Sequence, residues 1–136
     1  MANNGSRAER QLVHALEDLG FAVMRAPSSG AGTDSDRPDV LAGRETTSQV
    51  IAFEMKSKKD DYIYISKEQV DQLKRFSKAF GAKARIATRW DGDTTIYVGR
   101  VEDMDRSELR DEERMYRVKR EDATDNWETL EEHVND

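Results

Sequence analysis

Residues 37–56 read RPDVLAGRETTSQVIAFEMK, two apolar runs separated by a polar turn, with Pro-Asp at one end and Glu-x-Lys at the other. Short apolar runs bounded by turn residues predict a β-hairpin, here with strands over residues 37–43 and 49–57. Charged side chains at the ends of buried strands are costly unless they are paired or bind a metal. The stretch therefore predicts a hairpin with a charged site at its open end.

Two amphipathic segments flank this hairpin. Apolar residues at helical spacing predict helices over residues 6–19 and 66–80. Ser66 and Gln69 have the spacing of a capping box at the start of the second helix, and Gly81 is placed to end it.

Further strands are predicted from alternating and apolar runs. The Asp91-Gly92 pair is a strong hairpin turn. After Val101 the pattern weakens to a short strand and a short acidic helix. The predicted strands cover residues 21–26, 84–90, 94–100 and 115–119, and the acidic helix covers residues 126–134. This order predicts an α/β fold with a mixed central sheet flanked by helices.

Length and composition limit the class of protein. A chain of 136 residues is expected to form one domain, with a core over about residues 5–100 and an acidic C-terminal segment over residues 101–136. The absence of cysteine excludes disulfides and thiolate metal sites. No apolar run reaches 18 residues, so we expect a soluble, cytoplasmic protein without a membrane span.

The charge is unevenly distributed along the chain. Residues 1–100 carry 16 Lys and Arg against 14 Asp and Glu, whereas residues 101–136 carry 6 against 14. The net charge of −6 argues against a protein that coats DNA generally, but it leaves room for a local basic site. The acidity, with arginine favoured over lysine, indicates a halophilic host.

Asp39, Glu54 and Lys56 are the candidate catalytic residues within the hairpin. Side chains two positions apart on a strand share a face, so Glu54 and Lys56 project together, and the hairpin can bring Asp39 beside them. Two carboxylates form an oxygen site suited to Mg²⁺ or Mn²⁺, and a lysine can hold an attacking water. The alternative is a turn aspartate beside an ordinary ion pair.

The sequence pattern alone leaves the roles of several other residues open. Glu9, Arg10 and Arg25 are surface charges by default and become site residues only if they face the same cleft as Asp39. The loop that contains Ser29 can donate hydrogen bonds to a phosphate or can be a plain surface loop. Two further pairs are equally open: Lys58 and Lys59 as a DNA path or a solvated strand end, and Phe76 and Phe80 as an exposed patch or a core face.

Three segments together resemble a known enzyme family. GSRAERQLVHALEDLGFAVMRAPSSG, RPDVLAG and IAFEMKSKKDDYIYISKEQVDQLKRFSKAFG resemble archaeal Holliday junction resolvases of the Hjc type, within the PD-(D/E)XK nuclease superfamily. The resemblance covers roughly the first 90 residues. It implies a restriction-endonuclease-like core and a homodimer that nicks opposing strands of a four-way DNA junction symmetrically, with Mg²⁺ as cofactor, Mn²⁺ able to replace it, and no small-molecule cofactor.

The resemblance also implies roles for individual residues. The implied metal ligands are Glu9, Asp39 and Glu54, and Lys56 is the implied catalytic lysine. The implied junction contacts are Arg10, Arg25 and Ser29, and the implied dimer interface is Phe76 with Phe80.

Two other functions remain open. The chain could be another nuclease of the superfamily that cuts duplex or flapped DNA, or a junction-binding protein without catalysis. The full set of Asp39, Glu54 and Lys56 argues against the second, because a decayed site usually lacks one of these residues.

Overall fold

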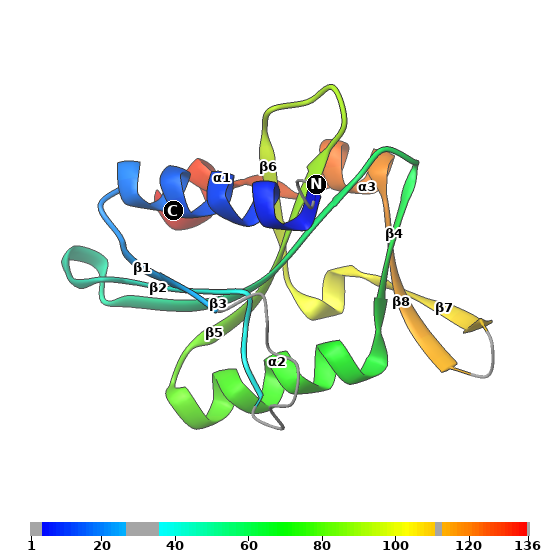
Figure 1. Ribbon diagram of the computed structural model, residues 1–136, viewed down its shortest axis with the longest axis horizontal. Coiled ribbons are helices and arrows are strands. Elements are labelled where there is room, and N and C mark those ends of the chain that lie inside the picture. Colours follow the sequence, from blue (N-terminus) through cyan, green and yellow to red (C-terminus); the bar gives the residue numbers. More distant parts are fainter. Residues whose placement is uncertain (1–3, 27–35, 111–112, 136) are drawn as a thin grey trace.

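A six-stranded sheet lies at the centre of the computed structural model, which describes residues 4–26, 36–110 and 113–135 (Figure 1). Its β3 and β5 strands run parallel and all other neighbours are antiparallel, so the sheet is mixed, as predicted. The strands, in their order across the sheet, are β1 (Ala22–Arg25), β2 (Val40–Arg44), β3 (Gln49–Lys58), β5 (Lys83–Trp90), β6 (Ile96–Gly99) and β9 (Glu128–Thr129).

A second, three-stranded antiparallel sheet lies beside the first. It is ordered β4 (Tyr62–Ser66), β8 (Glu113–Lys119) and β7 (Asp105–Arg110). The β8 strand contains the predicted strand at 115–119. The β4 strand was not predicted, although its Tyr-Ile-Tyr-Ile alternation is the signal of a half-buried strand.

Two long helices, α1 (Asn4–Asp18) and α2 (Lys67–Phe80), cover opposite faces of the central sheet (Figure 1). The predicted start of α2 is confirmed: Ser66 Oγ accepts from Gln69 N at 3.1 Å, and Ser66 N donates to Gln69 Oε1 at 3.2 Å. Gly81 ends the helix with a φ of 86°, which favours glycine. The short elements are η1 (Glu45–Thr47), η2 (Val101–Asp103), α3 (Arg120–Asn126) and α4 (Leu130–Asn135). No helix in the described ranges is long and apolar enough to cross a membrane.

The β3 strand separates two hydrophobic clusters. Alternate side chains of a strand point to opposite faces, so Ile51, Phe53 and Met55 pack under α1, whereas Ala52 packs with the cluster under α2 and the small sheet. Both faces of β3 are buried, as its apolar sequence predicts.

The acidic C-terminal segment contributes to both clusters. Its buried apolar residues are Val101, Met104, Val118, Ala123, Leu130 and Val134. The predicted helix over residues 126–134 is wrong in its bounds, because the chain leaves α3 at Trp127 and adds the two-residue β9 to the sheet before α4 begins.

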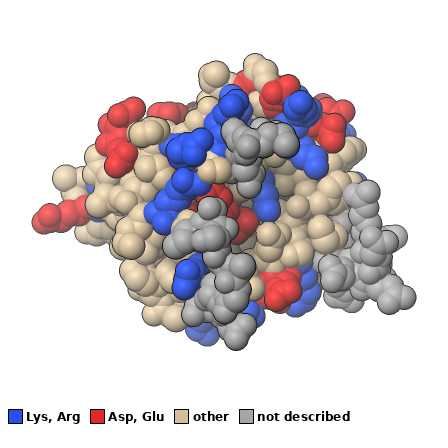
Figure 2. Space-filling view, viewed as in Figure 1, with Lys and Arg blue, Asp and Glu red and all other residues tan. Residues whose placement is uncertain are grey.

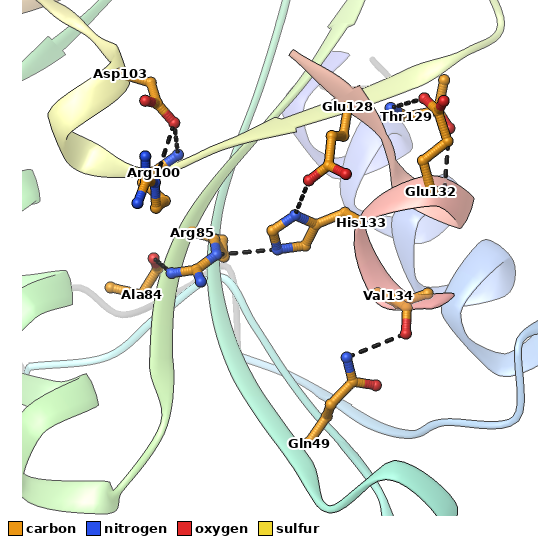
Figure 3. A network of polar contacts seen from close by, with 10 residues as sticks. All are labelled: Gln49, Ala84, Arg85, Arg100, Asp103, Glu128, Thr129, Glu132, His133 and Val134. Carbon is orange, nitrogen blue, oxygen red and sulfur yellow. Dashed lines mark hydrogen bonds and ion pairs between the residues drawn. The ribbon is translucent and has the colours of Figure 1, made fainter. Parts of the chain in front are cut away.

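Polar contacts attach α4 to strands of the central sheet (Figure 3). Arg85 Nε donates to His133 Nε2 at 3.0 Å, so His133 Nδ1 is the atom that can donate to Glu128 Oε1, 3.1 Å away. Gln49 Nε2 donates to the carbonyl of Val134 at 3.1 Å. These contacts and the buried residues above make the C-terminal segment an integral part of the fold.

Arg44 joins the first and last helices to the hairpin. Its guanidinium donates to the carbonyl of Leu19 at 2.8 Å and to that of Val134 at 2.6 Å, and its Cζ lies 4.5 Å from the centre of the Phe21 ring. We expect Arg44→Ala to lower the free energy of unfolding by about 2 kcal/mol, because two carbonyls lose a charged donor. Chemical denaturation measures this loss.

Arg75→Ala is the matched control, because Arg75 pairs with Asp36 on an exposed surface. Hydrogen exchange of Arg44→Ala should increase in α4 more than in α2. Equal stability of the two variants would show that Arg44 does not hold the C-terminal helix.

Candidate active site

The β2–β3 hairpin places Asp39 beside Glu54. Val40 pairs with Phe53, and just before this pair Asp39 N donates to the carbonyl of Phe53 at 2.9 Å. The Asp39 side chain is held in turn, because its Oδ2 accepts from Met55 N at 2.8 Å. The two carboxylates therefore lie together at the open end of the hairpin, as predicted.

Glu54 is the most unusual ionisable group of the site. It lies in the interior with only 7% of its surface exposed, and Lys56 Nζ is 3.5 Å from its Oε2. Burial, together with the nearby Asp39 carboxylate, raises the pKa of Glu54 to about 8, although Lys56 opposes the shift. At neutral pH the pair Asp39–Glu54 therefore resists carrying two negative charges.

This donor set fits a hard divalent cation. Within the described ranges, no group of three or more Asp, Glu or His side chains lies close enough together to hold a metal ion. Asp39 and Glu54 nevertheless offer carboxylate oxygens in one place, and a bound cation would offset the burial and the repulsion from Asp39 that raise the pKa of Glu54. The pair suits an ion such as Mg²⁺, which is typically bound by one or two carboxylates and retains several waters.

Glu9 of α1 lies near this pair, but another partner already holds it. Arg25 Nε donates to Glu9 Oε1 at 2.9 Å. Burial raises the pKa of Glu9 most, its hydrogen bond with Arg25 lowers it, and the charges of Asp39 and Lys56 also act on it. Glu9 is thus near the pair, and one of its two carboxylate oxygens is occupied by Arg25.

Arg10 and Arg25 converge beside Glu9. Both donate to Ser6 Oγ, Arg25 from Nη2 at 2.6 Å and Arg10 from Nη1 at 3.2 Å. The sequence did not single out Ser6, although its position one helical turn before Arg10 was a visible signal. Ser29 lies outside the described residues.

A basic groove continues from the site past the end of β3. It is a cavity of about 250 Å³ lined by Arg7, Ala8, Ser57, Lys58, Lys59, Arg89 and Asp91. On the face seen in Figure 2, Lys and Arg side chains gather around a small acidic area near the middle. The predicted lysines line this groove, and Arg7 and Arg89 are additional cations that no motif indicated.

Phe76 and Phe80 form one patch on α2. Their rings stack with centroids 5.3 Å apart, Phe76 is half-buried against the second cluster, and Phe80 is 55% exposed. Phe76 and Phe80 were predicted to form either an exposed patch or a core face. Each alternative describes one of the two rings, because Phe76 belongs partly to the core and Phe80 lies at the surface.

A family model described as archaeal Holliday junction resolvase (Hjc) matches residues 1–135. The chain belongs to this family. The predicted resemblance and fold class are thereby confirmed, and the match extends well beyond the 90 residues that carried the resemblance.

Named relatives agree with the family assignment. The chain is 43% identical over 86 residues to the crossover junction endodeoxyribonuclease Hjc of Sulfolobus acidocaldarius and 37% identical over 89 residues to that of Archaeoglobus fulgidus. The matched segments cover 62% and 65% of this chain but only 59% and 63% of the relatives' own lengths.

A solved structure matches over almost the whole chain. The structure of Archaeoglobus fulgidus Hjc, a Holliday junction resolvase, superposes with a TM-score of 0.81 at 26% identity, covering 98% of this chain and 97% of that one. The C-terminal segment, which showed little resemblance by sequence, therefore lies within the shared fold of the Hjc family.

Proposed function

We propose that this protein is a divalent-metal-dependent endonuclease that resolves four-way DNA junctions by symmetric paired nicks. The observation that carries the proposal is the Asp39–Glu54–Lys56 site, with a pKa of about 8 at Glu54, in a chain of the Hjc family. A buried carboxyl with a strongly raised pKa beside a second carboxylate is typical of a functional site.

Each residue of the site has a separate role in the proposed reaction. Nucleases of this family depend on a divalent metal ion, which when bound supplies positive charge for the phosphodiester and acidifies water. In our proposal Asp39 and Glu54 hold this ion, Mg²⁺ with Mn²⁺ able to replace it, and Glu9 joins them with the carboxylate oxygen that Arg25 does not occupy. Lys56, within 3.5 Å of Glu54, orients the attacking water and offsets the negative charge that develops on the phosphate.

Cations near the site bind the DNA backbone in this proposal. Arg10 and Arg25 lie beside Glu9, and Lys58 and Lys59 line the groove past the end of β3. We assign a phosphate contact to Ser29 as well. Their contacts are to phosphates and carry no sequence information, which suits an enzyme that selects a branched shape.

We further propose that two copies act together and that residues 1–136 form one nuclease domain. The exposed Phe80 ring, stacked on Phe76, supplies apolar surface for a contact between copies. A two-fold dimer presents one site to each of two opposing strands, which a symmetric pair of nicks requires.

Cleavage of a labelled four-way junction and of a matched linear duplex, each with and without Mg²⁺, tests this function. We expect paired symmetric nicks in the junction only with Mg²⁺, and a rate on the duplex lower by orders of magnitude. Asp39→Asn should remove cleavage, because it removes one of the two carboxylates.

Two other outcomes of this experiment would each indicate a different function. Equal cutting of both substrates would indicate a general nuclease of the superfamily. Tight junction binding without cutting under any condition would indicate a junction-binding protein. Repeating the binding step at molar salt tests the halophilic interpretation, which predicts that binding persists there.

A further inference from the structure

The Ser6 hydroxyl is the common acceptor of two cationic side chains from different elements. Arg10 lies one turn further along α1, and Arg25 comes from β1, 19 positions away in the sequence. Two guanidinium groups repel each other, so a shared acceptor is needed to keep them together. A hydroxyl oxygen has two lone pairs and can accept from both.

Ser6 also completes the anchoring of Arg25. The Arg25 Nε donates to Glu9 Oε1 at 2.9 Å, and its Nη2 donates to Ser6 Oγ at 2.6 Å. Two contacts fix the plane of a guanidinium, whereas a single contact to Glu9 leaves it free to rotate. The remaining N–H groups of Arg25, and those of Arg10, stay available for a further acceptor.

We propose that Ser6 is a positioning residue that holds Arg10 and Arg25 as one phosphate-binding unit beside Glu9. The inference rests on the proposed function, because the anion it assigns is a backbone phosphate of the DNA. Two guanidiniums that converge on one point match the several oxygens of a phosphate, and their pre-set geometry lowers the entropy lost on binding. Ser6 itself acts only through the two arginines.

A purely structural role for Ser6 makes a different prediction. Ser6 lies in the first turn of α1, where its hydroxyl can help to satisfy the backbone N–H groups of the helix start. In that case Ser6→Ala lowers the unfolding temperature and leaves DNA affinity unchanged. DNA affinity and stability must therefore be measured separately.

The main test is junction binding by Ser6→Ala and Ser6→Thr, without divalent metal, over a series of salt concentrations. We expect Ser6→Ala to weaken binding about tenfold and to make the slope of log Kd against log salt shallower by about one phosphate contact. Ser6→Thr keeps the hydroxyl and should bind like the wild type. Thr46→Ala, which removes an exposed hydroxyl at the η1 turn, is the matched control.

Epistasis shows whether Ser6 acts through the arginines. In a protein that already carries Arg10→Gln and Arg25→Gln, adding Ser6→Ala should change Kd less than twofold. An unchanged Kd in Ser6→Ala would overturn the inference.

One measurement separates this inference from the proposed function, because it needs no DNA. The Arg25 Nε–H signal of the free protein, followed by NMR, should lose exchange protection in Ser6→Ala and keep it in Ser6→Thr. Unchanged protection in Ser6→Ala overturns the positioning role. Wild-type protein that fails to bind junctions, with protection lost in Ser6→Ala, overturns the proposed function alone.

Discussion

Replacing Glu54 by glutamine should abolish cleavage and, at pH 8, make the metal-free protein more stable. Loss of one of the two carboxylates of the site should slow cleavage at least about a thousandfold. Removal of a key polar group from an active site typically has an effect of this size. Stability changes in the opposite direction because glutamine resembles the neutral form of Glu54, which the buried site prefers.

The sign of the pH dependence follows from the raised pKa. Glu54 has a pKa of about 8 in the folded protein and an ordinary value near 4.5 when unfolded. Between these values the folded state holds a proton that the unfolded state lacks. Stability that is fully present below pH 4.5 is therefore lost as the pH rises to about 8. Burial and the Asp39 charge raise this pKa while Lys56 opposes them, and we expect Glu54 to account for about 3 kcal/mol of this loss.

Thermal unfolding between pH 5 and 9 without metal measures the effect. The wild type should lose stability across this range, whereas Glu54→Gln should lose distinctly less, and Glu131→Gln, at an exposed position of α4, should follow the wild type. At pH 8 Mg²⁺ should raise the unfolding temperature of the wild type and of Glu131→Gln, but not that of Glu54→Gln. Parallel curves of unfolding temperature against pH for wild type and Glu54→Gln would mean that ionisation of Glu54 costs the folded state no stability.

A single methyl group at Gly99 should destabilise the fold strongly. A Cβ atom at Gly99 would lie 2.6 to 2.7 Å from three ring atoms of Trp127, closer than carbon atoms approach in folded proteins. The ring is bulky and belongs to the link between α3 and β9, so relief requires the C-terminal segment to move. We expect Gly99→Ala to lower the free energy of unfolding by about 3 kcal/mol, the upper range for overpacking.

Gly43→Ala is the control for the loss of a glycine in the same sheet. A Cβ atom there meets only the Gln49 carbonyl oxygen, at an ordinary 3.8 Å, so this variant should be close to neutral. Combining Gly99→Ala with Trp127→Leu should be less destabilising than the sum of the two changes, because the smaller side chain leaves room for the methyl. Strict additivity, measured by urea denaturation, would exclude the ring as the cause.

Elements with local signals could be predicted from the sequence. The hairpin of β2 and β3 follows from two apolar runs around a polar turn, and α2 follows from its Ser66 cap and Gly81 stop. The Asp91-Gly92 turn likewise joins β5 and β6, with Gly92 at a φ of 81°. These features depend on residues close together in the chain, which is why pattern alone suffices.

Elements that depend on distant partners could not be predicted in this way. The two-residue β9 exists only because Tyr97 and Val98 of β6 offer it a partner, and the sequence there reads as one helix. At the site, the hairpin register predicted the Asp39–Glu54 pair, but neither the contact of Arg25 with Glu9 nor its contact with Ser6 has a local signal. Such contacts depend on how α1 packs across β1.

The ribosome adds the two residues whose carbonyls Arg44 binds at very different times during synthesis. Leu19 precedes Arg44 in the chain, but Val134 follows it by 90 positions. At about 5 to 20 residues per second, the ribosome needs roughly 5 to 18 s to reach Val134 after Arg44. Asp39 is synthesised before that interval, and Glu54 and Lys56 are synthesised early in it. Nascent protein therefore carries these three residues for seconds before the last helix can close the fold around Arg44.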